Sequence, residues 1–396
     1  MIRAAHMEPG LVSLLIQNIG SGGAEKVAVN IANYLAKRGK KVHLVVIEHL
    51  EGHQHFLSPQ VTLINLNCKR RWCAIIPFTK YLLKEKPASV LAFLGVADII
   101  AIIATVLVPK KPRLLISEHS TYSMVKLKSA ELFTGENIIG KYLLKKLIAK
   151  YIYPLADEII AVSKDAAEDL ENYAGYQHGR VKNIYNPVIF PELFDMGKQS
   201  VPHPWLKDTH ASVILAVGRL SHEKNFALLI KAFAKIRTQC KAKLMIIGEG
   251  PEREALQQLI NNLGINDDVA LVGFQKNPYA YMSRTAALVL SSNYEGLSNV
   301  LIEALACGSP VISTDCKSGS REILADGKYG ILVPVGNIDA LATAMKEVLA
   351  NPEYYKNLAM NFKKEALYQY TTEYAGDAYL RLLFQGANNA LPMNDR

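Results

Sequence analysis

Cysteine is scarce in this sequence and follows no paired pattern. No C-x-x-C pair occurs, and the 396 residues include an odd number of cysteines: Cys68, Cys73, Cys240, Cys307 and Cys316. Such spacings argue against a disulfide framework and against a zinc cluster. The N-terminal residues also lack the longer apolar stretch and the cleavage site of a secretory signal. We therefore expect reduced thiols and a cytoplasmic location.

Internal repeats and long uninterrupted apolar runs are also missing. No repeat with a period of about 20–50 residues is present, which excludes solenoids and propellers. Residues 90–108 are apolar except for Asp98, and they are nearly as long as the roughly 20 residues of a membrane span. Gly95 and Asp98 divide this stretch into a strand-like and a helix-like part. We predict a buried strand and helix there instead of a span.

What remains is the pattern of a folded α/β protein, 50% hydrophobic and 20% charged. Apolar runs and chain breakers form two series of alternating strands and helices, typical of parallel sheets with helices on both faces. In the first series we predict strands at 11–17, 41–47, 61–66, 89–94, 113–117 and 157–162, and helices at 24–38, 75–86, 97–108, 138–153 and 164–174. In the second we predict strands at 211–218, 243–248, 269–274, 287–292, 310–314 and 330–335. The expected domains are 1–186 and 209–370, with a proline-containing linker at 187–208 and a C-terminal helix and tail at 371–396.

The positive charge is concentrated in the first half of the chain. Residues 1–190 hold 24 basic and 15 acidic side chains, whereas residues 191–396 hold 21 of each. The predicted helix 138–153 places four lysines on one broad face, with apolar residues available to bury elsewhere: Lys141, Lys145, Lys146, Lys150, Tyr142, Leu143, Leu147 and Ile148. With Trp72 nearby, this favours peripheral contact with the anionic inner face of the cytoplasmic membrane. A solvated basic face is the alternative, and no nucleic-acid-binding motif is present.

The first predicted turn is rich in glycine. Gly22 and Gly23 follow a strand and open a helix, where free backbone N–H groups and the helix dipole attract phosphate. A dinucleotide fingerprint would need a third glycine where Glu25 stands, although Glu48 sits where such proteins carry a ribose-binding acid. A glycine turn that serves only backbone geometry is a further alternative.

The second series also opens with a charged turn. Arg219 and Lys224 follow the strand 211–218, at the sheet edge where open α/β sheets bind ligands. Two cations there can neutralise a diphosphate. Alternatively, they are solvated or pair with Glu223.

Two glutamates mark a third turn. Glu295 precedes a helix that Ser298 can cap, and Glu303 lies within that helix. The backbone amides of residues 296–299 form a second anion site. The neighbours of Glu303 are nearly all apolar, so its charge needs a partner. Because the two carboxyl groups are too far apart to share a proton, we expect separate hydrogen-bonding roles.

In this order and at these intervals, the motifs resemble those of the retaining glycosyltransferases of family 4, over nearly the whole chain. They are GGAEK (22–26), SEHS (117–120), AVS (161–163), VGRLSHEKN (217–225), IIGEGPER (246–253), the E-x7-E of Glu295 and Glu303, and STDCKSGSREIL (313–324). The resemblance implies the GT-B architecture, an α/β fold with two Rossmann-like domains facing across a cleft, and a C-terminal helix that packs back on the N-terminal domain. The first domain would bind the acceptor and the second the nucleotide sugar.

The same resemblance implies roles for individual residues. Arg219 and Lys224 would bind the donor diphosphate, Glu303 the ribose, and Glu295 the hydroxyls of the donor sugar. His119 would lie beside that sugar, although an isolated loop histidine is more often an ordinary polar residue. The expected catalytic residues are thus His119, Glu295, Arg219 and Lys224. The expected donor-binding residues are Gly22, Gly23, Arg219, Lys224, Gly248, Glu249, Gly273, Phe274, Glu295, Gly296, Leu297, Ser298, Asn299 and Glu303.

Two features of this sequence depart from the family's pattern and bear on the chemistry of the site. Lys26 stands where many members carry arginine, which keeps the charge without the bidentate fork. No D-x-D motif occurs, so we expect no metal and no cofactor, and cations and helix termini would hold the phosphates. We predict an enzyme that transfers a hexose or N-acetylhexosamine from a UDP-linked donor to a glycan or lipid-linked glycan of a bacterial surface polysaccharide such as lipopolysaccharide. The alternatives are a GT-B epimerase or hydrolase, and a non-catalytic nucleotide-sugar-binding subunit.

Overall fold

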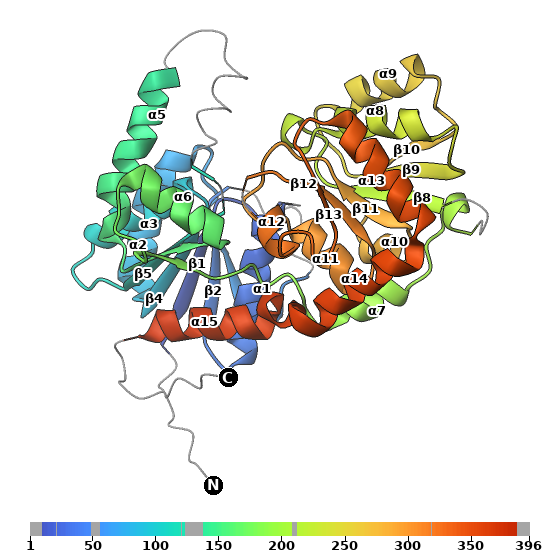
Figure 1. Cartoon of the computed structure of the whole chain (residues 1–396). Coiled ribbons are helices and arrows are strands. Elements are labelled where there is room, and N and C mark those ends of the chain that lie inside the picture. The colour runs from blue at the N-terminus through green and yellow to red at the C-terminus, as the bar shows by residue number, and fades with distance from the viewer. Residues whose placement is uncertain are drawn as a thin grey trace. The chain divides into compact units, whose positions relative to one another are not determined.

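The computed structural model describes residues 10–20, 22–48, 56–119, 121–122, 138–207, 212–317 and 319–385. They belong to two compact units, shown in Figure 1. Unit 1 comprises Met1–Val162, Ala166–Pro187 and Thr372–Arg396, and unit 2 comprises Ser163–Asp165 and Val188–Thr371. Each unit has one parallel sheet with helices packed on it, which confirms the predicted fold class.

Among the described residues, unit 1 contains a seven-stranded sheet in the order β3-β2-β1-β4-β5-β6-β7. Its strands are β1 (Val12–Ile16), β2 (Val42–Val46), β3 (Val61–Asn65), β4 (Ser89–Phe93), β5 (Arg113–Glu118), β6 (Glu158–Ala161) and β7 (Val181–Asn183). Every residue of β1, β2 and β4 is buried, because helices cover both faces of the sheet. The first six strands were predicted from their apolar runs, whereas the short and partly polar β7 was missed.

The helices of unit 1 pack on opposite faces of this sheet. They are α1 (Gly23–Lys37), α2 (Ile75–Glu85), α3 (Val96–Val106), α5 (Ile138–Leu147), α6 (Lys164–Ala174) and the C-terminal α15 (Thr372–Phe384). One apolar core joins the sheet to α2, α3 and α6, and another joins it to α1 and α15. The C-terminal helix therefore packs on the N-terminal domain, as predicted (Figure 1).

Two predictions about helices of unit 1 had different outcomes. Residues 90–108 form β4 and α3 as predicted, and across the described part of the chain no helix has the length and apolar character to cross a membrane. The predicted helix 138–153 instead ends in a π-helical turn, Ile148–Ile152, and a 3-10 turn. Leu143 and Leu147 were expected to be buried, but they are 51% and 52% exposed. The reason is that α5 projects beyond the sheet (Figure 1), so no core is available to cover them.

Unit 2 contains, within its described residues, a six-stranded sheet in the order β10-β9-β8-β11-β12-β13. Its strands are β8 (Ser212–Val217), β9 (Ala242–Ile247), β10 (Val269–Gly273), β11 (Ala287–Leu290), β12 (Val311–Thr314) and β13 (Ile331–Val333), all close to the predicted ranges. Its helices are α7 (Glu192–Lys198), α8 (Phe226–Ile236), α9 (Arg253–Asn262), α10 (Tyr279–Met282), α11 (Asn299–Cys307), α12 (Ser320–Ile323), α13 (Ile338–Ala350) and α14 (Pro352–Glu365). Helix α7 lies within the segment 187–208 that was expected to be a linker, and residues 386–396 of the expected tail lie outside the described residues.

Candidate active site

The strand order of unit 2 defines where a ligand can bind. Strand β8 pairs with β9 on one side and with β11 on the other, all parallel. The chain runs from β8 out to β10, and then returns to the other side of β8 to form β11. This reversal places the carboxyl ends of β8 and β11 next to each other, which is the topological switch point where open α/β sheets bind ligands. Both charged turns of the second series follow these two strands.

An ion pair joins the two turns. Lys224 Nζ donates to Glu295 Oε1 at 2.6 Å, and the two side chains are 22% and 11% exposed. Ser292 Oγ donates to the same carboxylate oxygen at 2.7 Å. The alternative pairing of Lys224 with Glu223 is thus wrong, since the partner comes from the neighbouring strand. The structure brings the predicted phosphate-binding cation and the predicted sugar-binding acid into direct contact.

Arg219 differs from Lys224 in its surroundings. Its side chain is exposed, and in the described ranges it forms no ion pair. Its backbone carbonyl accepts a hydrogen bond from Ser221 Oγ at 3.3 Å, which supports the turn after β8. The switch point therefore carries one cation neutralised by a carboxylate and one that is available for an anion.

The glycines after β9 allow this turn to pack closely. Gly248 has a φ of +144°, and a Cβ there would overlap the carbonyl oxygen of Gly218. Leu220 N also donates to Glu249 O at 3.0 Å, which ties the two loops together. The Glu249 side chain forms an exposed pair with Arg253 at 2.9 Å.

Gly273 is the last residue of β10, the edge strand next to β9, and Phe274 follows it. Gly273 has a φ of +80° and Phe274 is 55% exposed. An exposed aromatic ring at this sheet edge offers a surface on which a flat ligand can stack. The role of Phe274 in donor binding stays a prediction.

The residues at the start of α11 fit the predicted anion site except for one detail. Gly296 and Leu297 precede the N-cap residue Ser298, and Asn299 is the first helical residue. Ser298 was expected to cap the helix, but its hydroxyl makes no hydrogen bond to it. The side chain is instead buried, at 2% exposure. The amides at this helix start are thus left without the side-chain acceptor that was predicted.

Glu303 has the partner that its apolar surroundings required. The carboxylate is 6% exposed, and Tyr279 OH donates to Glu303 Oε1 at 3.1 Å. Burial, reinforced by the charge of Glu303, raises the pKa of Tyr279 well above its usual value, so the phenol stays protonated as a donor. Spacing along the sequence did not identify Tyr279, because it lies on α10.

Cys316 is a further residue that the sequence did not single out. Its pKa is raised to about 11, first by burial and then by the charge of Glu295. Thr314 Oγ1 donates to Ser292 O at 2.6 Å, so β12 supports the loop that holds Glu295. The thiol is therefore protonated near pH 7.

In unit 1, Gly22 and Gly23 lie at the start of α1, as predicted. Gly22 is the N-cap residue, and both glycines are exposed. The neighbouring Ser21 lies outside the described residues. Burial raises the pKa of Glu25, in the first turn of α1. The sheet order places this turn, after β1, beside the end of β4 at the switch point of unit 1.

His119 follows β5 and is held by two side chains. Its Nε2 lies 3.2 Å from Ser117 Oγ, and its ring is 5.8 Å from that of Phe93. Burial lowers the pKa of His119 to about 3, so the imidazole is neutral near pH 7. A neutral ring donates one hydrogen bond and accepts another, but it does not supply a positive charge. Ser120, the last residue of the motif, lies outside the described residues.

The surroundings of Glu48 do not favour a dinucleotide. Gln17 Nε2 donates to Glu48 Oε2 at 2.8 Å, and Arg71 Nε lies 3.5 Å from Glu48 Oε1. Both carboxylate oxygens are thus engaged by protein groups, whereas a ribose-binding acid must offer its oxygens to the ligand.

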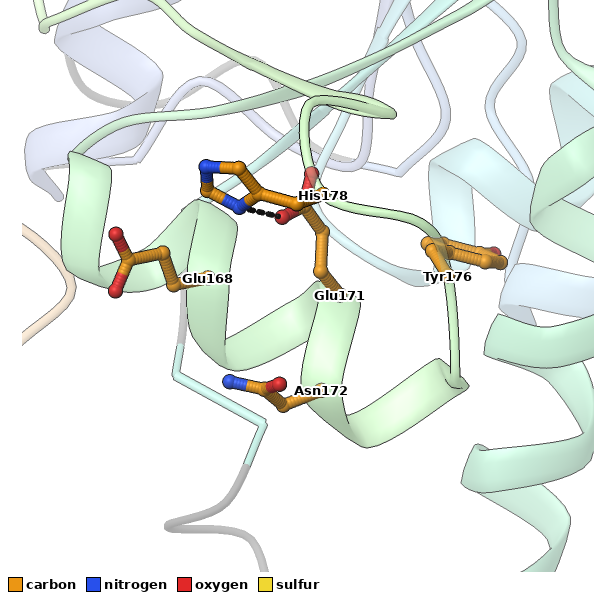
Figure 2. A pocket seen from close by; sticks show the side chains of 5 residues that line it. All are labelled: Glu168, Glu171, Asn172, Tyr176 and His178. Carbon is orange, nitrogen blue, oxygen red and sulfur yellow. Dashed lines mark hydrogen bonds and ion pairs between the residues drawn. The ribbon is translucent and has the colours of Figure 1, made fainter.

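A hollow on unit 1 is lined by residues other than the predicted site residues (Figure 2). It has a volume of about 340 Å³ and is lined by Glu168, Glu171, Asn172, Tyr176 and His178. His178 Nδ1 lies 3.1 Å from Glu171 Oε2, and Val181 N donates to the other oxygen. Two carboxylates in so small a space repel a phosphate. In the described ranges, no group of three or more histidine, cysteine or acidic residues is arranged to hold a metal ion.

Comparison with known proteins identifies the family of this chain. Residues 21–189 match the model of Glycosyltransferase Family 4, and residues 198–365 match that of Glycosyl transferases group 1. A relative in Campylobacter jejuni, N-acetylgalactosamine-N,N'-diacetylbacillosaminyl-diphospho-undecaprenol 4-alpha-N-acetylgalactosaminyltransferase, is 33% identical, with 88% of this chain and 93% of the relative covered.

Solved structures share the fold. Sucrose-phosphate synthase from Thermosynechococcus elongatus superposes with a TM-score of 0.77 at 20% identity, covering 95% of this chain and 98% of that one. Anabaena HepE in complex with UDP-glucose superposes with a TM-score of 0.76 at 19% identity, covering 94% and 99%. The fold is therefore that of the GT-B glycosyltransferases.

This chain belongs to glycosyltransferase family 4, and it is a glycosyltransferase.

Proposed function

We propose that this enzyme transfers an N-acetylhexosamine or hexose from a UDP-linked donor to a lipid-linked glycan, with retention of the anomeric configuration. The observation that carries the proposal is the Lys224–Glu295 pair beside the exposed Arg219, at the switch point of unit 2. The UDP-glucose bound by HepE and the N-acetylgalactosaminyl transfer named for the Campylobacter relative support the donor class. The same relative's name includes diphospho-undecaprenol, which supports a lipid-linked acceptor.

The ion pair suggests how the donor is bound. When a diphosphate enters, Lys224 exchanges the carboxylate for phosphate oxygens, and Arg219 contributes a second cation. Glu295 is then free to accept hydrogen bonds from the hydroxyls of the donor sugar. Glu303, held by Tyr279 through one oxygen, accepts from the ribose hydroxyls. Each partner keeps at least one charge-assisted hydrogen bond after the exchange, because the sugar hydroxyls and Ser292 Oγ donate to Glu295, and this limits the cost of separating the ion pair.

The reaction follows from charge placement. The bond between C1 of the sugar and the phosphate oxygen breaks, and its electron pair leaves with UDP. The acceptor hydroxyl oxygen attacks C1 from the same face, and its proton passes to the leaving phosphate oxygen. Negative charge grows on the diphosphate, where Arg219, Lys224 and the amides of residues 296–299 stabilise it most in the transition state. His119 donates or accepts a hydrogen bond at the sugar. No metal or other cofactor is required by this scheme.

The acceptor is held by unit 1, whose α5 surface suits a membrane. We define the α5 surface as the exposed residues Leu143, Leu144, Lys145, Lys146, Leu147, Lys150 and Tyr151. Its three leucines are 51%, 58% and 52% exposed, and Tyr151 is 60% exposed. Leucines at this exposure can enter the interfacial region while the lysines contact anionic head groups, each contributing about 1 kcal/mol. Lys141, the fourth lysine predicted for this face, is outside the described side chains.

Product analysis tests the function. The purified chain is incubated with UDP-GalNAc, UDP-GlcNAc, UDP-galactose, UDP-glucose or GDP-mannose, with and without an undecaprenyl-diphosphate-linked glycan. We expect UDP release only with acceptor, and an α-linked product in the NMR spectrum. Release without acceptor indicates a hydrolase, an inverted anomer contradicts retention, and donor binding without any turnover indicates a binding subunit.

Vesicle sedimentation tests the membrane contact. The protein should bind phosphatidylglycerol-containing vesicles at low salt and leave them at high salt. Lys145→Gln with Lys146→Gln should weaken partitioning about 30-fold, from about 1 kcal/mol per lysine. Lys231→Gln with Lys241→Gln, two exposed lysines of unit 2, is the matched control and should change nothing. Equal binding to neutral and anionic vesicles, or to neither, contradicts this contact.

A further inference from the structure

The C-terminal helix reaches the residue that the proposed function places beside the donor sugar. We propose that Tyr379 of α15, acting through Ser117, is a positioning residue that fixes His119 in the tautomer with its proton on Nδ1 and directs that N–H to the reacting sugar. This inference rests on the proposed function for the role of His119. The positioning itself is testable without turnover.

The three polar groups form a continuous chain within unit 1. Tyr379 OH lies 3.1 Å from Ser117 Oγ, and Ser117 Oγ lies 3.2 Å from His119 Nε2. Ser117 is fully buried, and Tyr379 is 1% exposed. Phe93, at the end of β4, has its ring tilted by 47° against the imidazole, which restricts rotation of the imidazole. The ring of His119 is thus held by one hydrogen bond and one aromatic contact.

The available donors and acceptors determine the direction of the two hydrogen bonds that link Tyr379, Ser117 and His119. In the part of the chain that the structure describes, Ser117 Oγ is the partner of the Tyr379 hydroxyl. Leaving the donor of a buried hydroxyl unsatisfied costs about 1–3 kcal/mol, so Tyr379 donates to Ser117. The Ser117 hydroxyl then donates to His119 Nε2, which must be the unprotonated nitrogen. The opposite direction would leave the phenol proton without an acceptor.

The protonation of His119 completes the assignment. Burial lowers its pKa to about 3, so the ring is neutral and carries one N–H near pH 7. Since Nε2 accepts from Ser117, the proton is on Nδ1. Burial likewise raises the pKa of Tyr379 to about 12, which keeps its phenol protonated. A single tautomer pre-organises one donor, whereas a free imidazole would divide its population between two.

The helix that carries Tyr379 is firmly anchored. Arg113 Nε donates to Leu382 O at 2.6 Å, and Ser89 Oγ donates to Leu383 O at 2.5 Å. Tyr34 OH donates to Asp377 Oδ1 of the same helix at 2.6 Å. These contacts keep Tyr379 in place, so removal of its hydroxyl alone should leave α15 docked.

The decisive experiment is the ¹⁵N NMR spectrum of His119, identified by its loss in His119→Gln. We expect the Nδ1–H pattern in the wild type and a mixture of tautomers in Tyr379→Phe and in Ser117→Ala. The kcat should fall about tenfold with the loss of one such bond, with UDP affinity unchanged because unit 2 binds the nucleotide. Tyr34→Phe is the matched control, since it removes a hydrogen bond to α15 but leaves the hydrogen bonds of Tyr379, Ser117 and His119 in place. It should leave the tautomer and kcat unaltered.

The outcomes separate the two proposals. An Nε2–H pattern in the wild type, or an Nδ1–H pattern that persists in both Tyr379→Phe and Ser117→Ala, overturns the positioning. A tautomer change with unaltered kcat also overturns it if His119→Gln is inactive. If His119→Gln keeps wild-type activity, the assigned role of His119 in the proposed function fails, and the tautomer spectra still decide whether Tyr379 sets the proton.

Discussion

Lys224→Met is expected to weaken UDP binding, slow transfer and destabilise unit 2, because one ammonium group serves both the diphosphate and Glu295. Methionine keeps the length of the side chain but removes its charge. The carboxylate of Glu295, 11% exposed, then retains Ser292 Oγ as a partner at 2.7 Å but loses its cation. A partly buried charge without its counter-ion is costly.

The magnitudes follow from the geometry of the pair. Fully exposed ion pairs contribute about 0.2–1 kcal/mol. With Nζ and Oε1 at 2.6 Å and side chains 22% and 11% exposed, we expect a coupling of about 1–3 kcal/mol between Lys224 and Glu295. Loss of one pre-organised transition-state donor should lower kcat/KM by about 10²–10³.

A double-mutant cycle measures both effects. Lys224→Met, Glu295→Gln and the double variant are compared by urea unfolding, by UDP titration calorimetry and by kcat/KM. Glu295→Gln should keep UDP affinity while lowering turnover. Lys235→Met is the matched control, since its pair with Asp339, 2.5 Å long, is 52% and 81% exposed. That control should lose at most about 1 kcal/mol and leave kinetics unchanged.

Two results would refute this reasoning. One is UDP affinity in Lys224→Met within twofold of the wild type together with more than half of its activity, since Lys224 would then not contact the diphosphate. The other is strict additivity of the Lys224→Met and Glu295→Gln stability changes, which would mean that the pair does not form in solution.

Three further predictions concern other groups. Glu303→Gln should weaken UDP binding about tenfold or more by calorimetry, with a smaller loss in Tyr279→Phe, and unchanged affinity in both would remove Glu303 from the donor site. Asp98 is fully buried, and burial followed by the charge of Glu118 raises its pKa well above 3.8, so folding favours the form of Asp98 that carries a proton. The folded state therefore binds this proton more tightly than the unfolded chain, and the free energy of unfolding should decline as pH rises from 3.8 through the raised pKa. Asp98→Asn should flatten that slope in urea titrations, and an unaltered slope would contradict the raised pKa of Asp98. EDTA should leave the transfer rate unchanged, and a rate abolished by EDTA and restored by Mg²⁺ or Mn²⁺ would contradict the metal-free scheme.

The local features of the fold could be predicted because they depend on neighbouring residues. Apolar runs located the strands of both sheets. Gly39, with a φ of +77°, follows the end of the first helix, because a residue in the left-handed region cannot continue a right-handed helix. Features that need the rest of the molecule were missed. Strand β7 has three residues and no continuous apolar pattern, and Leu143 and Leu147 are exposed because α5 extends past the sheet that would bury them.

By itself the sequence determined which groups are present and which of them needed partners. Glycines at strand ends, cations after β8 and an acid among apolar neighbours in α11 follow from composition and spacing. Only the tertiary structure decided which partners they meet. Lys224 pairs with Glu295, 71 positions away, and Tyr379 reaches Ser117 across 262 positions. Such contacts depend on strand order and on the docking of α15, and neither leaves a periodic signal in the residues concerned, because side-chain contacts over long separations are set by packing and not by local propensity.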